Sequence, residues 1–423
     1  MQTLLANTLQ LLDFQAIRDQ VAGMTTFAAA RTLALGTIPS FDPAEVTEFH
    51  KETGEGVFLL DIVSDLDLGV ADNCLDIVGR AAKGGTITGL DLLVIASCVE
   101  VFRRVRSAVL SMRTETPTLA AMARKIADVA DVDRKISSCI GSRGEVLDGA
   151  TPVLGELRRQ VRTAYGRLSE AIEDVMNSSS GVEALQDRVV AVRGERLVLQ
   201  VKREQRDRVP GIVHDASNTG ATLFIEPFAT VDLGNAWREL ILKEEWETKK
   251  VLSELSEIVG GAEHDIVVSV EMAARLDLIL ARARHGVALG GSLALAGDSS
   301  CSTGVRLSEA RHPLLGDGAV PITIDIPQDR PVIVITGPNT GGKTLAMKTL
   351  GLLALMHQSG LRIPVSDGST IPVFEGIYAD IGDQQSVEGS VSTFGSHISN
   401  VIDILSHATS NSLVLLDELG TST

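Results

Sequence analysis

The residues best suited to chemistry in this sequence form a glycine-rich turn. It lies between a predicted buried strand, residues 332–335, and a helix that we expect to begin at Lys343. The turn follows the pattern G-x-x-x-x-G-K-[ST], in which backbone amides surround phosphate, the lysine reaches the outer phosphates and the final hydroxyl binds Mg²⁺. A chance match is the alternative, which the flanking strand and helix disfavour. The predicted binding residues for a nucleoside triphosphate are Gly337, Pro338, Asn339, Thr340, Gly341, Gly342, Lys343 and Thr344.

An acidic pair, Asp417 and Glu418, follows the apolar run 413–416, which we predict to be a strand. Hydrolysis of a triphosphate requires a metal ion and an oriented water besides the phosphate cradle. We therefore predict that Asp417 and Thr344 hold Mg²⁺, and that Glu418 and Lys343 are catalytic. A solvated strand end is the alternative for the acidic pair, and it becomes less favoured once a phosphate-binding turn is present.

A small β-rich segment interrupts an otherwise helical region. Helical spacing over 153–176 changes to period-two alternation on both sides of Gly194-Glu195, which predicts a β-hairpin. A further strand is predicted at 222–226, and helical spacing returns over 231–258. Basic residues cluster in this segment. The sequence leaves two interpretations of the cluster open: a contact with nucleic-acid phosphates, or a solvated strand face. The cluster comprises Arg193, Arg196, Lys202, Arg203, Arg206 and Arg208, of which the last four are the predicted nucleic-acid contacts.

Composition limits the classes of function. The 423 residues exceed one compact core, and the formal charge of −17 argues against nucleic-acid binding by the whole surface. An aromatic content of 3% disfavours a base-stacking platform. The four cysteines form no C-x-x-C pair, so we expect reduced thiols. With neither a signal-peptide pattern nor an apolar run of membrane-spanning length, we expect a cytoplasmic protein without a membrane partner.

The remaining periodicity predicts helices at the start of the chain and between the β-rich segment and the glycine-rich turn. Residues 79–89 are predicted to be a loop, followed by helices over 90–112 and 118–135. The expected domains are an N-terminal helical core at 1–152, two long helices with a β-rich tip (187–230) at 153–285, a connector at 286–304 and a nucleotide domain at 305–423.

Four stretches have motifs more specific than a generic phosphate-binding turn: 309–315 (Glu-Ala-Arg-His-Pro-Leu-Leu), 336–344 (Thr-Gly-Pro-Asn-Thr-Gly-Gly-Lys-Thr), 380–394 and 412–418. These stretches resemble the MutS family of DNA-processing ATPases, and the resemblance extends along essentially the whole chain. Stretches 209–215 and 220–227 make the second bacterial branch, which lacks a mismatch-recognition domain, the most similar. The resemblance implies a multidomain fold: an all-α core with a clamp-like β-rich tip, followed by a partial α/β P-loop ATPase domain of the ABC type.

The resemblance also implies ligands and partners. ATP and Mg²⁺ are the expected cofactors, and a homodimer is the expected assembly of the full-length form. In the family, the signature region reaches the nucleotide of the partner chain, which assigns Ser392 to the site in trans. Ser392 and Thr393 also have the character of a helix N-cap, and both interpretations can hold together.

Two functions follow from the resemblance, and the sequence leaves both open. The first is ATP-dependent binding of branched or junction DNA that restrains homologous recombination, with an endonuclease activity supplied by a C-terminal Smr-type domain in full-length relatives. The second is an ATPase that acts on ribosomes or rRNA and splits stalled ribosomes. The last residue, Thr423, comes five residues after Glu418. We therefore expect a C-terminally truncated ATPase domain that hydrolyses ATP poorly and tends to aggregate along an unpaired strand edge.

Overall fold

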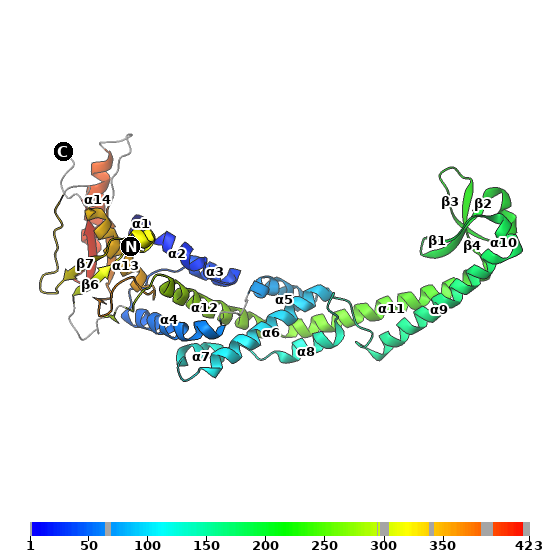
Figure 1. Cartoon of the computed structure of the whole chain (residues 1–423), viewed down its shortest axis with the longest axis horizontal. Helices are drawn as coiled ribbons and strands as arrows, with labels where there is room; N and C mark the ends of the chain where they lie inside the picture. Colours follow the sequence, from blue (N-terminus) through cyan, green and yellow to red (C-terminus); the bar gives the residue numbers. More distant parts are fainter. Residues whose placement is uncertain are drawn as a thin grey trace. The chain divides into compact units, whose positions relative to one another are not determined.

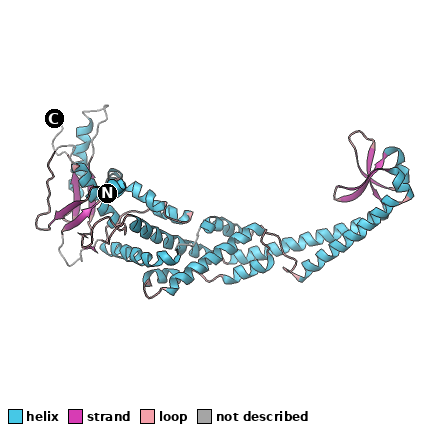
Figure 2. Ribbon diagram, in the orientation of Figure 1, coloured by secondary structure: helices cyan, strands magenta, loops and turns pink. Residues whose placement is uncertain are grey.

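The computed structural model describes residues 2–63, 69–293, 295–296, 304–337, 342–381 and 392–417. Helices dominate the described chain, and its strands form three small sheets (Figures 1 and 2). The chain divides into two compact units. The first contains Met1–Leu75, Ser97–Ala130 and His264–Thr423, and the second contains Asp76–Ala96 and Asp131–Glu263.

The helices of the first unit come from both ends of the chain. Pro43 begins one long helix as the first helical residue, where its missing N–H is not needed, and Asp42 accepts a hydrogen bond from the amide of Ala44 at 2.9 Å. The helices and turns are α1 (Gln2–Leu11), α2 (Phe14–Ala22), α3 (Ala28–Leu35), α4 (Pro43–Val63), η1 (Gly69–Asn73), α6 (Gly89–Ser111, shared with the second unit), α7 (Pro117–Ala123), α12 (Glu263–Ala288), η3 (Pro313–Gly318), α13 (Lys343–His357) and α14 (Ser392–His407).

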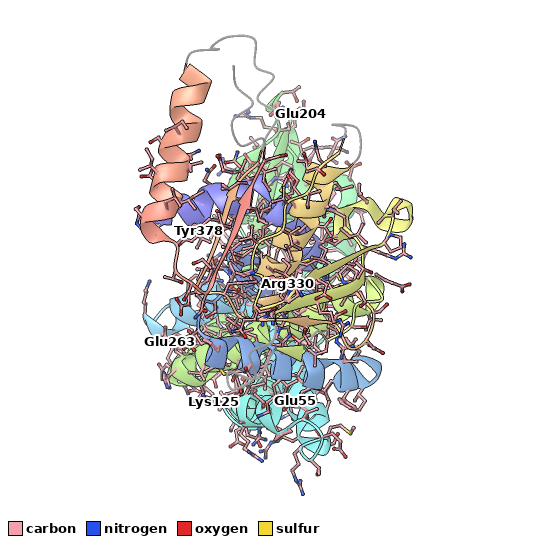
Figure 3. All side chains as sticks on the ribbon, turned by 90° about the vertical axis from the view of Figure 1, so that its left-hand side faces the viewer. Glu55, Lys125, Glu204, Glu263, Arg330 and Tyr378 are labelled. Carbon is pink, nitrogen blue, oxygen red and sulfur yellow. The ribbon has the colours of Figure 1, made fainter. Side chains whose placement is uncertain are left out.

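Two sheets belong to this unit. One has the strand order β5-β8-β6-β7, and the other is the parallel pair β9 and β10, in which Leu416 lies opposite Asp380. The β9 residue Tyr378, labelled in Figure 3, donates from its hydroxyl to the carbonyl oxygen of His407 at the end of α14, at 3.4 Å. The strands are β5 (Leu295–Ala296), β6 (Val305–Ala310), β7 (Ile322–Ile326), β8 (Thr370–Ile371), β9 (Gly376–Asp380) and β10 (Ser412–Leu416).

The core of the first unit surrounds α13. Every residue of this helix from Thr349 to His357 is buried, so the helix requires apolar cover on all sides. Strands β9 and β10 provide part of that cover through Ile377 and Leu415, and α1 and α2 provide another part. Residues from the beginning of the chain therefore complete the core of its C-terminal portion.

The second unit contains a pair of long helices that end in a small sheet (Figure 1). Thr151 caps the first of these helices by accepting a hydrogen bond from the Leu154 amide at 3.0 Å, and Pro152 begins it. Arg158 joins the two helices by donating to Glu244 at 2.8 Å. The helices and turn of this unit are α5 (Cys74–Ala82), α8 (Ala130–Cys139), α9 (Pro152–Asn177), α10 (Ser179–Ala184), η2 (Arg203–Arg208) and α11 (Phe228–Gly261).

The small sheet has the strand order β1-β2-β4-β3, and all its neighbours are antiparallel. The predicted hairpin is confirmed: Gly194 and Glu195 have φ of 56° and 63°, as in a two-residue turn of the type that matches strand twist. Glu195 pairs with Arg238 of α11 at 2.6 Å. The strands are β1 (Leu185–Arg193), β2 (Arg196–Lys202), β3 (Gly211–Ala216) and β4 (Thr222–Pro227).

Some local expectations were wrong. The predicted loop 79–89 begins inside α5, because Gly79 is accommodated within the helix, which ends before Gly84 with its φ of 81°. The predicted helix 118–135 is two helices, α7 and α8, separated by irregular residues. Strand β3 was not predicted, because its sequence Gly-Ile-Val-His-Asp-Ala alternates poorly and becomes a strand by pairing with β4. None of the helices in the described ranges combines the length and apolar character needed to traverse a bilayer.

A buried pair of histidines joins α4 to the end of α13. The rings of His50 and His357 have centroids 4.4 Å apart, with an interplanar angle of 34°. Burial, with a smaller contribution from the charges of Arg282 and Arg362, lowers the pKa of His50 to about 4. Burial, together with the charge of His50, lowers the pKa of His357 to about 3. Both rings are therefore neutral in the folded protein at pH 7.

We predict that acid destabilises the first unit through this pair. Between pH 6.5 and pH 4 the unfolded chain protonates His50 and His357 while the folded chain does not, so the free energy of unfolding falls as the pH falls. Each ring contributes on the order of 2–3 kcal/mol to this loss. Urea midpoints measured by circular dichroism at several pH values should show it, and the double variant His50→Phe/His357→Phe should have a flatter profile. Substitution of the exposed His264 by Gln is the control. The prediction would be refuted if the urea midpoint of the double variant depended on pH as steeply as that of the wild type.

Candidate functional site

The glycine-rich turn leads directly into α13. Gly342 precedes the helix with a φ of 78°, a left-handed conformation that glycine adopts without steric cost. Lys343 is the first helical residue, and its Nζ donates to the carbonyl oxygen of Gly337 at 2.7 Å. The first-turn amides of a helix have no partner within it and attract anions. The described part of the turn therefore combines a lysine ammonium with the start of a helix.

The hydroxyl of Thr344 meets the carboxylate that follows β10. Thr344 Oγ1 donates to Asp417 Oδ2 at 2.6 Å, although the two residues are 73 positions apart. The backbone N–H of Asp417 donates to the carbonyl oxygen of Asp380 at 3.0 Å, which extends the parallel pairing of β9 and β10 by one residue. A hydroxyl and a carboxylate side by side are hard oxygen ligands of the kind that Mg²⁺ selects.

Asp380 is a residue of this site that the sequence analysis did not single out. It ends β9, and its side chain is buried. Because β9 and β10 are parallel, Asp380 and Asp417 lie at the same edge of the sheet, where ligands of open α/β sheets bind. The signal was available, since an apolar run, residues 376–379, directly precedes this aspartate as another precedes Asp417.

The remaining predicted nucleotide residues are placed only in part. Ser392 is the first residue of α14. Residues 338–341 and Glu418 lie outside the described residues, so the assignments of Pro338, Asn339, Thr340, Gly341 and Glu418 stay predictions. Among the residues that the structure describes, no three His, Cys, Asp or Glu side chains converge as a metal site of their own.

The predicted strand before the turn is not formed. Residues 332–335 pair with no strand among those described, and their side chains face solvent, with Val332 and Val334 exposed by 78% and 80%. An apolar run favours a strand, but a strand forms only where a neighbouring backbone supplies hydrogen bonds. Neither the β9–β10 pair nor the sheet that contains β6 provides that neighbour. The prediction of a buried strand here was therefore wrong for this structure.

The basic residues at the tip differ in their surroundings. Arg196 is largely buried and donates to Glu226 at 3.1 Å, while His214 approaches the other oxygen of Glu226 at 2.7 Å. Arg193 pairs with Asp215 at 3.4 Å. These contacts hold strands of the tip sheet together, so Arg193 and Arg196 serve the fold.

The four predicted nucleic-acid residues all have exposed side chains at the end of β2 and on η2. Arg203 donates to the carbonyl oxygen of Gly220 at 3.0 Å, and Arg208 pairs with Glu183. Within the described chain, Lys202 and Arg206 have neither an ion pair nor a side-chain hydrogen bond. These two are therefore the basic side chains of the group that remain available to a phosphate.

Comparison with known proteins assigns the site to a family. Residues 333–423 match MutS domain V. The chain is 40% identical over 419 residues to Endonuclease MutS2 of Geobacillus sp. (strain WCH70), an alignment that includes 98% of this chain and 53% of the relative. It is 38% identical over 420 residues to Endonuclease MutS2 of Halalkalibacterium halodurans, again over 98% and 53%. For Endonuclease MutS2 of Bacillus cereus (strain Q1) the identity is 40% over 425 residues, 99% of this chain and 54% of the relative.

The chain belongs to the MutS family. Its similarity to MutS2 proteins along almost its whole length places it in the second branch, as the sequence motifs predicted. It spans about half the length of the curated relatives that it matches. The mostly helical, multidomain fold agrees with this membership. The predicted domain boundaries stay predictions.

We predict that the exposed run at 332–335 drives self-association. An exposed, unpaired run of β-branched apolar residues promotes association between chains. The variant Val332→Glu/Val334→Glu should slow aggregation, measured by light scattering at constant temperature, and leave the melting temperature unchanged. The variant Val287→Glu/Val320→Glu, which changes two other exposed valines of the same unit and adds the same charge, is the control. Equal slowing by both variants would show that net charge, and not this run, limits aggregation.

Proposed function

We propose that this chain is the ATP-binding and DNA-contacting portion of a MutS-type ATPase. The contact between Thr344 and Asp417 is the observation that carries the proposal, because it brings a phosphate-loop hydroxyl and a strand-end carboxylate to one point. Membership of the MutS family and the similarity to MutS2 proteins support the same assignment.

In this proposal, the turn from Gly337 to Thr344 cradles the phosphates of ATP. Lys343 neutralises charge on the outer phosphates, and Thr344 and Asp417 supply oxygen ligands to Mg²⁺. The metal ion, when bound, neutralises charge that develops on the phosphates. Glu418 orients the attacking water, and Ser392 reaches the nucleotide of a partner chain in a homodimer.

We predict that Lys343→Ala weakens binding of a fluorescent ATP analogue in the presence of Mg²⁺. Loss of the charge-assisted contacts of one ammonium group should lower the affinity roughly tenfold to a hundredfold. The control is Lys51→Ala, which removes an exposed lysine of α4 that makes no ion pair within the described chain. Equal affinity of the Lys343→Ala variant and the wild type would contradict the assignment of the turn.

The second part of the proposal assigns the tip of the second unit to a nucleic-acid contact, with branched DNA as the substrate. Lys202 and Arg206 project from a surface close to the ends of β2 and η2, where a backbone phosphate could approach both. Phosphate contacts of this kind position a protein on DNA and carry little sequence information. Such a contact suits a protein that recognises junction geometry and restrains recombination. Cleavage, to which the name of the relatives refers, is assigned to the Smr-type domain of the branch.

We predict that Lys202→Glu/Arg206→Glu weakens binding to a four-way DNA junction and reduces the salt dependence of that binding. The slope of log K against log salt should decrease in magnitude by about 0.9 for each phosphate that the protein no longer neutralises. The control is Arg124→Glu/Lys125→Glu, which makes the same change of charge on an exposed segment of the first unit. Titrations of junction DNA, linear duplex and stalled ribosomes at one salt concentration identify the preferred substrate. A preference for ribosomes, or equal slopes for the two variants, would contradict the DNA assignment.

A further inference from the structure

The two helices at the beginning of the chain meet the nucleotide site of the same unit. Helices α1 and α2 are joined by Leu12 and Asp13; α1 lies against β9, and α2 lies against α13. Helix α13 carries Lys343 and Thr344 in its first turn. Residues separated by more than 300 positions in the sequence therefore adjoin the helix that would bind phosphate.

An ion pair fixes one side of the corner. Asp13 Oδ2 lies 2.8 Å from Nζ of Lys348, which is five residues after Lys343 in α13. Asp13 has φ 55° and ψ 28°, a left-handed conformation that is unusual for residues other than glycine and that aspartate and asparagine tolerate best. Glycine would adopt this backbone with less strain, but it has no carboxylate to offer Lys348.

His312 extends the electrostatic surroundings of this pair. It precedes η3 and is largely buried. Burial lowers the pKa of His312, the charge of Asp13 opposes this effect, and the charge of Lys348 adds to it. All three groups are therefore within electrostatic range of one another beside α13.

Close packing fixes the other side of the corner. Leu12 is fully buried, and a methyl group placed on Gly351 would lie 2.7 Å from Leu12 Cδ1 and 2.6 Å from Leu415 Cδ1. Both distances are shorter than carbon–carbon contacts in proteins, so a side chain at this point would displace the ends of Leu12 and Leu415. The corner and β10 therefore both pack against α13 at Gly351.

The same two elements hold the proposed metal ligands. Leu415 in β10 is two residues before Asp417, and Gly351 is two helical turns after Thr344. The separation of α13 from β10 at Gly351 is therefore one determinant of the 2.6 Å contact between Thr344 and Asp417. A displacement of the corner would alter this separation.

We propose that the Leu12–Asp13 corner is a positioning element of the nucleotide site. It holds α13 against β10, so that Thr344 and Asp417 share one Mg²⁺. Neither residue touches ATP or the metal ion. The inference rests on the proposed ATP and Mg²⁺ binding and adds to it a determinant from the opposite end of the sequence.

The test compares the affinity for a fluorescent ATP analogue with and without Mg²⁺. Asp13→Asn preserves tolerance of the left-handed backbone and removes the charge, and Lys348→Gln removes the other partner. Each should reduce the Mg²⁺-dependent gain in affinity by about threefold to tenfold, and the double variant should lose no more than either single variant. Glu239→Gln/Lys243→Gln, which removes a 2.7 Å ion pair on α11, is the control.

The outcomes distinguish the positioning role of the corner from the proposed ATP and Mg²⁺ binding. A purely structural ion pair would lower the melting temperature of Asp13→Asn and Lys348→Gln and leave the Mg²⁺-dependent gain equal to that of the wild type. That result, with a wild type that binds the analogue, would overturn the positioning role and leave the proposed function intact. A wild type that binds no analogue would overturn the proposed function, and the positioning role with it.

Discussion

The hydrogen bond between Thr344 and Asp417 is the contact on which the candidate site depends. A glycine-rich turn can attract phosphate by itself, because its amides and lysine are local in sequence. A magnesium site needs a second oxygen from another element, and the parallel pairing of β9 with β10 brings that oxygen to the N-terminal end of α13. The same pairing places the buried Asp380 beside it.

Burial of α13 explains why the first unit is assembled from distant segments. From Thr349 to His357 the helix has no solvent-facing side, so several elements must surround it. Strands β9 and β10 provide part of the cover, and Leu12, between α1 and α2, and Phe14 of α2 add more. A helix that binds phosphate at its N-terminal end is thereby immobilised over the rest of its length.

The tip of the second unit uses basic residues for two different purposes. Arg196 donates to the buried Glu226 and so stabilises the sheet, whereas Lys202 and Arg206 remain on the surface. Burial of an unpaired carboxylate would be costly, which explains why Glu226 has both Arg196 and His214 as partners. A count of positive charges in a sequence therefore overestimates the surface that is available to a nucleic acid.

Local patterns in the sequence determined much of the secondary structure of this protein and its family. The long helices, the hairpin at Gly194-Glu195, the start of α13 and the MutS family membership all follow from periodicity, turn chemistry and motif spacing within short windows. These properties need no knowledge of the rest of the chain, because they depend on backbone geometry and on neighbouring residues.

Tertiary structure decided which strands pair, which charged side chains form ion pairs and which segments pack together. The run 332–335 has the composition of a strand but lacks a neighbouring backbone, and Arg196 has the charge of a phosphate ligand but is occupied by Glu226. The placement of Leu12 and Asp13 against α13 is likewise absent from any local pattern. Strand pairing, burial and ion pairs each require a second group that is distant in sequence, and only the folded chain specifies that group.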